Sequence, residues 1–328
     1  MKTPLMTRIL LATDFSHDAA RALEYGMHLA TAWQAALEVL HVIEAPHWLP
    51  GDTEAVAVVE QARMAAARQL EEVRDELAGN GIPAKVRLVL GNPTEHICLD
   101  AKDRGVDLVV LGVQGRKSQL YGLIGSTAEQ VVKEGPCPVL VVPGCRDEAA
   151  TPLPTGRSVA IRHILAPVDF SAISLDAVEY AVHLAHSFGA TLTLMHVLEP
   201  VCYDLDCGLG TIEQETSKRE YWNQQLTELR EAIAALGLVT DLEVSGGLPS
   251  DAILACALRH HTDLIVMGTH GRGGRSPERF GSVADAVLRR ATSPVLTVKT
   301  PKFAPGHHRV VPTALGLAES REPEDRLR

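Results

Sequence analysis

The chain is poor in aromatic residues and has no long uninterrupted apolar segment. Phe, Trp and Tyr make up 4% of its 328 residues, whereas hydrophobic residues make up 46%, so the core must be built from Ala, Val, Leu and Ile. Such cores are usual for parallel sheets covered by helices. No apolar run approaches the roughly 18 residues of a membrane span, and residues 1–12 contain one short apolar strand rather than a signal peptide. We therefore expect a soluble, cytoplasmic α/β protein without a membrane partner.

Cysteine usage and charge exclude further classes. The six cysteines include no C-x2-C pair, so neither a disulfide framework nor a zinc ribbon is indicated. Lys and Arg number 31 against 41 Asp and Glu, which gives a net charge of −10. This balance argues against a general basic surface for nucleic acid. We expect reduced thiols and no nucleic-acid partner.

Several catalytic and nucleotide signatures are also missing. The sequence contains no GxxxxGK[ST] phosphate loop, no GxGxxG after the first strand and no GxSxG elbow. Among the fourteen histidines, His183 and His186 share a helix face and His260 adjoins His261. These histidines do not suggest a convincing ligand set at helical spacing. We expect no catalytic nucleophile and no metal centre built from side chains.

What the chain does contain is an internal repeat. Residues 9–16 (ILLATDFS) match residues 164–171 (ILAPVDFS), and residues 107–112 (DLVVLG) match residues 263–268 (DLIVMG). The register shifts by a single residue between these blocks, so the two halves must share one fold. The repeat predicts domains over residues 1–146 and 157–302. Residues 147–156 have the composition of a linker, and we expect residues 303–328 to form a mobile tail.

Within each half the periodicity alternates between strand and helix. The strands predicted for the first half are residues 8–13, 37–43, 84–90, 108–111 and 139–142. The predicted helices are residues 17–33, 53–78, 94–104 and 126–134, and Thr94 is the expected cap of the third helix. This alternation implies right-handed crossovers and a five-stranded parallel sheet with helices on both faces. Ligands of such sheets bind at the carboxyl ends of the strands.

The strongest chemical signal follows the fourth strand of each half, where glycines recur at fixed spacing before a helix. In the second half these residues are Gly268, Gly271, Gly281 and Ser282, and in the first half Gly112, Gly115, Gly125 and Ser126. Glycines let main-chain N–H groups approach a polyphosphate, and a helix N-terminus offers unpaired donors and a positive dipole end. Tight turns and helix capping would explain the same residues more simply. The repeated position at the carboxyl edge favours a phosphate site.

Together these segments resemble the universal stress protein family. The resemblance rests on residues 167–171 (PVDFS), 268–274 (GTHGRGG), 281–284 (GSVA) and 293–296 (SPVL), and it covers both halves. It implies two flavodoxin-like, Rossmann-like domains of strand order 3-2-1-4-5 that bind ATP through a G-x2-G-x9-G-[S/T] motif. We expect Mg²⁺ to accompany the ATP, because the phosphates need their charge neutralised.

The resemblance also implies particular site residues. Asp169 would meet the adenosine and the main chain of Val197 the adenine edge. From position alone, Asp169 and Asp14 either accept hydrogen bonds from a ligand or cap the following helix. The second-half set is Pro167, Asp169, Val197, Met267, Gly268, His270, Gly271, Arg272, Gly281, Ser282 and Val283. The first-half set is Asp14, Val42, Gly112, Gln114, Gly115, Arg116, Gly125, Ser126 and Thr127.

The first half departs from the family pattern at three places. It has Ala12 where the second half has Pro167, Gln114 for His270, and the stiffer pair 117–118 for the glycines at 273–274. We therefore expect ATP to bind more tightly in the second half. The arginines at 272, 275 and 279 are either a solvated face or a clamp for the γ-phosphate.

The function implied is an ATP-binding sensor or regulator of a stress response rather than a fast enzyme. There are two alternatives: a slow ATPase or phosphotransferase that uses the same site, and an interaction module in which both sites are vestigial. The resemblance further implies that the last strands, residues 139–142 and 295–298, pair within one chain as a pseudo-dimer, and a further homodimer is conceivable.

Overall fold

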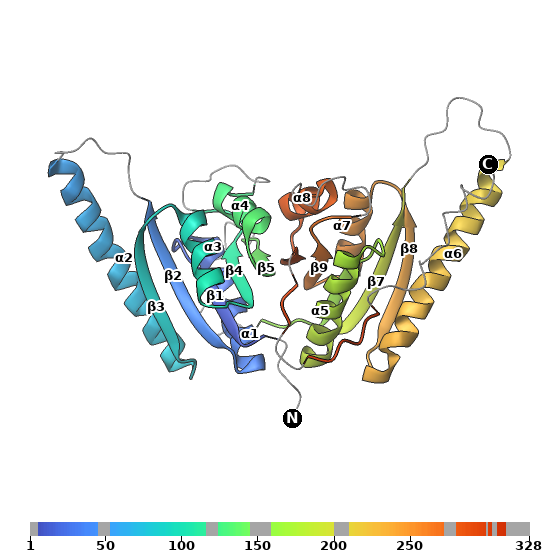
Figure 1. Cartoon of the computed structure of the whole chain (residues 1–328), viewed down its shortest axis with the longest axis horizontal. Coiled ribbons are helices and arrows are strands. Elements are labelled where there is room, and N and C mark those ends of the chain that lie inside the picture. The colour runs from blue at the N-terminus through green and yellow to red at the C-terminus, as the bar shows by residue number, and fades with distance from the viewer. Residues whose placement is uncertain are drawn as a thin grey trace. The chain divides into compact units, whose positions relative to one another are not determined.

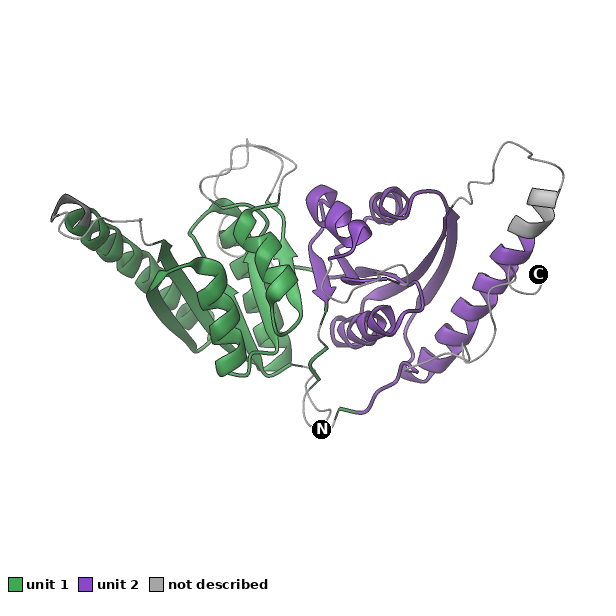
Figure 2. Cartoon of the chain, turned by 45° about the horizontal axis from the view of Figure 1, so that its top comes forward, with its two compact units in different colours: residues 1–160, 299–307 green, residues 161–298, 308–328 purple. Residues whose placement is uncertain are grey.

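The computed structural model describes residues 6–44, 53–115, 124–144, 159–199, 210–271, 280–299, 301–303 and 307–312. The chain divides into two compact units, residues 1–160 with 299–307 and residues 161–298 with 308–328 (Figure 2). Each unit is an α/β domain with five parallel strands, which confirms the predicted fold class.

The first unit alternates strand and helix along its length (Figure 1). Its elements are β1 (Arg8–Ala12), α1 (His17–Trp33), β2 (Ala36–Glu44), α2 (Thr53–Gly79), β3 (Ala84–Gly91), α3 (Pro93–Asp103), β4 (Leu108–Gly112), α4 (Ser126–Glu134) and β5 (Val139–Val142). The strands lie in the order β3-β2-β1-β4-β5, and all pairs are parallel. This is the strand order that the resemblance implies.

The second unit repeats this arrangement. Its elements are β6 (His163–Pro167), α5 (Ala172–Phe188), β7 (Thr191–Leu198), α6 (Gly210–Ile233), the 3-10 turn η1 (Ala234–Leu236), β8 (Thr240–Gly246), α7 (Pro249–Arg259), β9 (Leu264–Gly268), α8 (Ser282–Arg290) and β10 (Val295–Val298). The strand order is β8-β7-β6-β9-β10, again parallel throughout.

The central strands are apolar because helices cover both of their faces. Residues 108–111 of β4 and all four residues of β5 are buried. In the first unit α1 packs on β1, β4 and β5, α2 packs on β3 and β2, and α3 contacts α4. The chain reverses its direction across the sheet after β3, so right-handed crossovers place α1 and α2 on one face and α3 and α4 on the other. This reversal opens a crevice between the carboxyl ends of β1 and β4.

Helix α3 corrects one predicted detail. Its cap is Asn92, whose side-chain oxygen accepts the Glu95 N–H at 3.2 Å, and Pro93 occupies the first helical position. The prediction of Thr94 as the cap is therefore wrong. Thr94 is buried, and its hydroxyl donates to Oε1 of Gln130 at 2.9 Å. Proline favours the first turn, where its missing N–H costs nothing.

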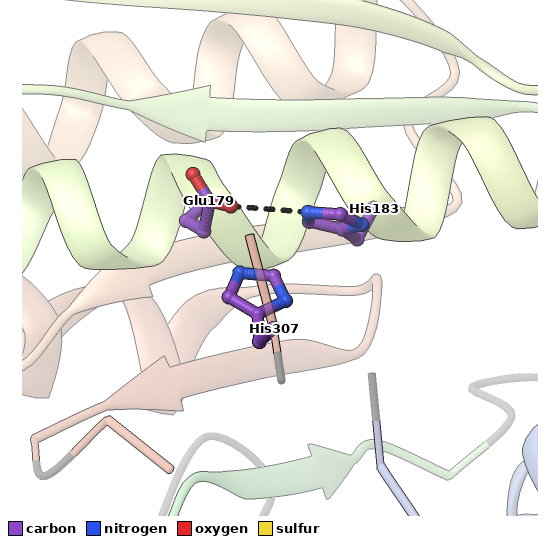
Figure 3. Close-up of side chains that lie close together, drawn as sticks. All are labelled: Glu179, His183 and His307. Carbon is purple, nitrogen blue, oxygen red and sulfur yellow. Dashed lines mark hydrogen bonds and ion pairs between the residues drawn. The ribbon is translucent and has the colours of Figure 1, made fainter. Parts of the chain in front are cut away.

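Residues 308–312, which follow the last strand and belong to the second unit, attach to α5. The carboxylate of Glu179, which is fully buried, accepts the backbone N–H of Val310 at 3.1 Å and that of Val311 at 2.7 Å. Glu179 also bonds His183 Nε2 at 3.0 Å, as Figure 3 shows. Of the tail 303–328, only residues 303 and 307–312 are described. Among the described residues, no helix is long and apolar enough to cross a membrane.

Candidate nucleotide site

The first strand of each unit ends in a turn that presents an aspartate at the carboxyl edge. In the second unit, the backbone N–H of Ser171 donates to Asp169 Oδ1 at 3.0 Å, and the hydroxyl of the same serine donates at 2.6 Å. Phe170 between them has φ +62°, a left-handed conformation that is rare outside glycine. Asp14, Phe15 and Ser16 form the same backbone turn in the first unit.

The serine, not the aspartate, caps the helix that follows. Ser171 Oγ accepts the N–H of Ser174 at 3.2 Å, and Ser16 Oγ accepts that of Ala19 at 3.2 Å. The alternative in which each aspartate serves as the helix cap is therefore wrong. The carboxylate of Asp169 instead lies at the strand end, half-buried, where the sheet rule places a ligand.

The glycine motif after the fourth strand lies directly against this carboxylate. A Cβ added to Gly271 would come within 2.5 Å of Asp169 Oδ2, and a Cβ added to Gly115 within 2.7 Å of Asp14 Oδ2. No larger residue fits there unless the aspartate moves. The structure thus brings together the aspartate and the second glycine of each motif, which lie about a hundred positions apart in the chain.

The third glycine of each motif joins the next helix to the end of the fourth strand. The N–H of Gly281 donates to the Thr269 carbonyl at 2.8 Å, and that of Gly125 donates to the Val113 carbonyl at 2.8 Å. Both glycines occupy the cap position, and neither helix has a side-chain cap. The first N–H groups of α4 and α8 are therefore not committed to a capping side chain.

The serines of the motif are the first residues of these helices. Ser282 and Ser126 are exposed, and Val283 and Thr127 follow them with half-buried side chains. The prediction of a first-turn hydroxyl is confirmed, although the cap itself is glycine. An exposed hydroxyl beside open N–H groups and the positive end of a helix dipole suits an anionic ligand.

The second strand of each sheet extends beyond the first strand and offers main chain to the same edge. The Val168 N–H donates to the Met195 carbonyl at 2.8 Å, and β6 has ended by that point. Val197 lies two residues further along β7. In a strand, the main-chain N–H and C=O groups of residues two apart point to the same neighbouring strand. The main-chain groups of Val197 therefore point, like those of Met195, to the side of β6, into the space beyond its end. Val42 holds the same position relative to Leu40, whose carbonyl accepts the Thr13 N–H at 2.9 Å.

An aromatic cluster backs this edge in the second unit. The ring of His196 lies 4.1 Å from that of Trp222 and 5.7 Å from that of Phe170, and Phe170 stacks on Trp222 at 5.3 Å. His196 Nδ1 bonds the Val168 carbonyl at 2.8 Å. In the first unit His41 keeps the matching bond, to the Thr13 carbonyl at 2.7 Å, and its ring lies tilted against that of Phe15 with 4.5 Å between the centroids. In the first unit, the position that corresponds to Trp222 in the repeat is an alanine, residue 66 or 67.

Family comparison identifies what the two units are. The model of the universal stress protein family matches residues 6–143 and again residues 160–299. The chain belongs to the universal stress protein family. It carries two copies of the family domain in tandem.

Relatives of this universal stress protein share either one domain or the whole tandem. A universal stress protein of Methanocaldococcus jannaschii, MJ0531, is 32% identical over 143 residues, which cover 43% of this chain and 84% of the relative. The universal stress protein Rv2005c of Mycobacterium tuberculosis is 26% identical over 304 residues, which cover 89% of this chain and 96% of the relative. The crystal structure of a universal stress protein from Archaeoglobus fulgidus superposes with a TM-score of 0.63 at 23% identity, over 89% of this chain and 95% of that one. The similarity to the Archaeoglobus fulgidus structure shows a shared fold.

The two sites of this universal stress protein differ at the helix that follows the first strand. In the first unit Asp18 Oδ2 accepts the Gln114 N–H at 3.0 Å, so a carboxylate sits under the glycine loop. Burial raises the pKa of Asp18, although hydrogen bonds from the backbone of Gln114 and Gly144 oppose the shift. Ile173 takes this place in the second unit, where a Cβ added to Gly268 would lie 2.9 Å from its Cγ2.

The remaining expected residues fall into two groups. Pro167 and Met267 are buried at the ends of β6 and β9. His270 is half-buried, and its Nδ1 bonds the Thr269 hydroxyl at 2.8 Å. Arg272 and Arg116 lie outside the described residues, as do residues 117–118, 273–275 and 279.

Proposed function

We propose that this tandem universal stress protein binds ATP at the carboxyl edge of its second unit, and more weakly at the same edge of its first unit. One observation carries the proposal. Gly271, the strand-end carboxylate of Asp169 and the uncapped N-terminus of α8 converge at one place on the carboxyl edge. A carboxylate that can accept hydroxyl groups, beside a cluster of N–H donors, is a complementary pair for a ribose linked to phosphates.

The residues present fit the parts of the nucleotide. Asp169 is suited to accept hydrogen bonds from the sugar hydroxyls, and the outward main chain of Val197 can pair with the edge of the adenine. The open N–H groups of α8 and the hydroxyl of Ser282 are the donors for phosphate. Mg²⁺ bound to the phosphates would neutralise part of their charge.

The preference for the second unit follows from charge. In the first unit the carboxylate of Asp18 is bonded to the glycine loop itself, close to the place where the phosphates should pass. A fixed negative charge there opposes another anion. The second unit has the neutral Ile173 instead, and its edge is also backed by Trp222.

We assign Asp169 to binding rather than to catalysis. Its Oδ1 already accepts two hydrogen bonds from Ser171, which lowers its value as a base for activating water. A cytoplasmic sensor or regulator whose state depends on bound nucleotide is therefore the proposed role, and fast turnover is not expected.

Calorimetric titration with Mg-ATP tests the proposal on matched variants. A carboxylate introduced by Gly281→Asp places charge at the N-terminus of α8, and Gly125→Asp does the same at α4. We expect Gly281→Asp to remove most of the high-affinity binding and Gly125→Asp to have a smaller effect. Circular dichroism establishes that both variants are folded, and mass spectrometry of the purified protein identifies any nucleotide already bound.

Two results would contradict the proposal. Absence of heat and of any thermal stabilisation with nucleotide-free wild-type protein would exclude ATP binding, because a ligand of the native state must raise its stability. Equal losses from both variants would refute the preference for the second unit while leaving ATP binding intact.

A further inference from the structure

A second group of ligand-forming side chains lies between β8 and the end of α7 in the second unit. Glu243 comes from β8, and Cys256 and His260 come from successive turns at the end of α7. One ligand atom from each lies within 4.8 Å of the others.

The three groups converge on a single oxygen. Cys256 Sγ lies 3.4 Å from Glu243 Oε2, and His260 Nε2 lies 3.3 Å from the same atom. Zinc bonds of about 2.3 Å to sulfur and about 2.0–2.2 Å to nitrogen and oxygen give a tetrahedron with edges of roughly 3.3–3.6 Å. The two separations from Glu243 Oε2 are close to the edges of such a tetrahedron, and Cys256 Sγ and His260 Nε2 lie within 4.8 Å of each other.

The surroundings also suit a metal. The other oxygen, Glu243 Oε1, is held at 2.7 Å by the guanidinium of Arg259, which fixes the direction of Oε2. Cys256 is buried, whereas the side chain of His260 is 34% exposed and leaves a path to solvent. His163 stacks on His260 with 5.5 Å between ring centroids and supports its orientation.

The first unit shows what this place looks like without metal ligands. The repeat aligns Glu243, Cys256 and His260 with Arg87, Asp100 and Arg104. There an ion pair between Arg87 and Asp100 links β3 to α3, and Arg104 reaches Glu38 at 3.1 Å. Arginines do not bind cations, so the first unit is a natural negative control. A salt bridge alone would need only Glu243 and Arg259 in the second unit.

We propose that Glu243, Cys256 and His260 bind a thiophilic divalent cation of the Zn²⁺ type, with water from the solvent side as the fourth ligand. Binding joins the middle of β8 to the end of α7. The metal displaces the thiol proton of Cys256 to solvent as the metal–sulfur bond forms.

Cobalt titration of the full chain, prepared without a histidine tag and stripped with a chelator, tests this site. Co²⁺ is the probe, because tetrahedral coordination by a thiolate gives a sulfur-to-cobalt charge-transfer band and intense visible bands. We expect one Co²⁺ per chain and displacement of the spectrum by Zn²⁺. Cys256→Ser should abolish the charge-transfer band. His260→Gln should weaken the apparent affinity by more than about tenfold, since even supporting residues cost about 10- to 100-fold.

Matched controls separate this site from unspecific binding. Cys98→Ser removes a half-buried cysteine of the first unit, and His261→Asn removes the exposed neighbour of His260 at a left-handed position that asparagine tolerates. Both should leave the titration unchanged. If Cys256→Ser does not fold, His260→Gln and Glu243→Gln carry the test. A wild-type protein without the charge-transfer band, or a band that survives loss of Cys256, would overturn the proposal.

Discussion

The buried carboxylate of Glu179 offers a sharp test of how the chain end contributes to stability. Glu179→Ala removes the acceptor of the Val310 and Val311 N–H groups and of His183 Nε2. The repeat supplies the control. Glu24 is the equivalent residue of the first unit, where it is half-buried and burial raises the pKa of its carboxyl group.

The magnitude follows from the exposure of the donors that lose their partner. A buried donor left unsatisfied costs about 1–3 kcal/mol. Val311 is 1% exposed and should incur the larger part of this cost, whereas Val310 is half-buried and can reach water. We expect Glu179→Ala to lower the free energy of unfolding of the second unit by about 2–4 kcal/mol. Glu24→Ala should change that of the first unit by less than about 0.5 kcal/mol.

Urea unfolding followed by tryptophan fluorescence can resolve the second unit. The chain has three tryptophans, at positions 33, 48 and 222. With phenylalanine at 33 and 48, Trp222 in α6 alone reports the second unit, and circular dichroism reports the whole chain. Glu179→Gln keeps one acceptor oxygen and should lose less than Glu179→Ala. A midpoint for Glu179→Ala within error of the parent protein, at unchanged m-value, would refute the reasoning.

Three further predictions address the turn, the glycine motif and a half-buried histidine. Ser171→Ala removes the N-cap of α5 and should lower the free energy of unfolding by about 1 kcal/mol, measured in urea. Gly271→Ala should weaken ATP binding in calorimetry, because the added Cβ would lie only 2.5 Å from Asp169 Oδ2 and force that carboxylate to move. Gly246→Ala is the control, since a Cβ there meets no atom within 4 Å, and it should leave ATP binding unchanged. Burial, and His260 beside it, lower the pKa of His163, so its contribution to stability is present above about pH 6.5 and is lost as the pH falls toward its folded pKa. His163→Gln should make the melting temperature less sensitive to acid over that interval.

The fold could be predicted from the sequence because every strand is short, apolar and followed by a helix, and because the repeat states the pattern twice. Boundaries were accurate where a cap is unambiguous, as at Ser16. The prediction was wrong at Thr94, since the Asn92–Pro93 pair is the stronger start signal. Asn92 and Thr94 can both cap a helix, and only the position of Pro93 shows which of the two does so.

The candidate site could be predicted in outline. Strand ends and glycine spacing located Asp169, Gly271 and Gly281, and the structure brings them to one edge. Trp222 could not be found this way, because a tryptophan in a long amphipathic helix looks like any core residue until the helix is packed against β7. The Cys256–His260 pair has helical spacing, but the sequence prediction missed it and expected no metal centre; its third partner on β8 becomes visible only in the fold.

The two units share their backbone structure and differ in the side chains that pack against it. The strand order, the left-handed turn after the first strand and the glycine contacts at the carboxyl edge are the same in both. The differences lie where side chains meet those elements: Asp18 against Ile173, Arg87 against Glu243, and Glu24 against Glu179. Each exchange changes a charge or its burial and leaves the backbone in place. When a duplicated domain keeps its backbone and changes the charges around it, one copy can bind a ligand while the other copy takes a different role. Variants made at matching positions of the two units therefore measure most directly what each half does.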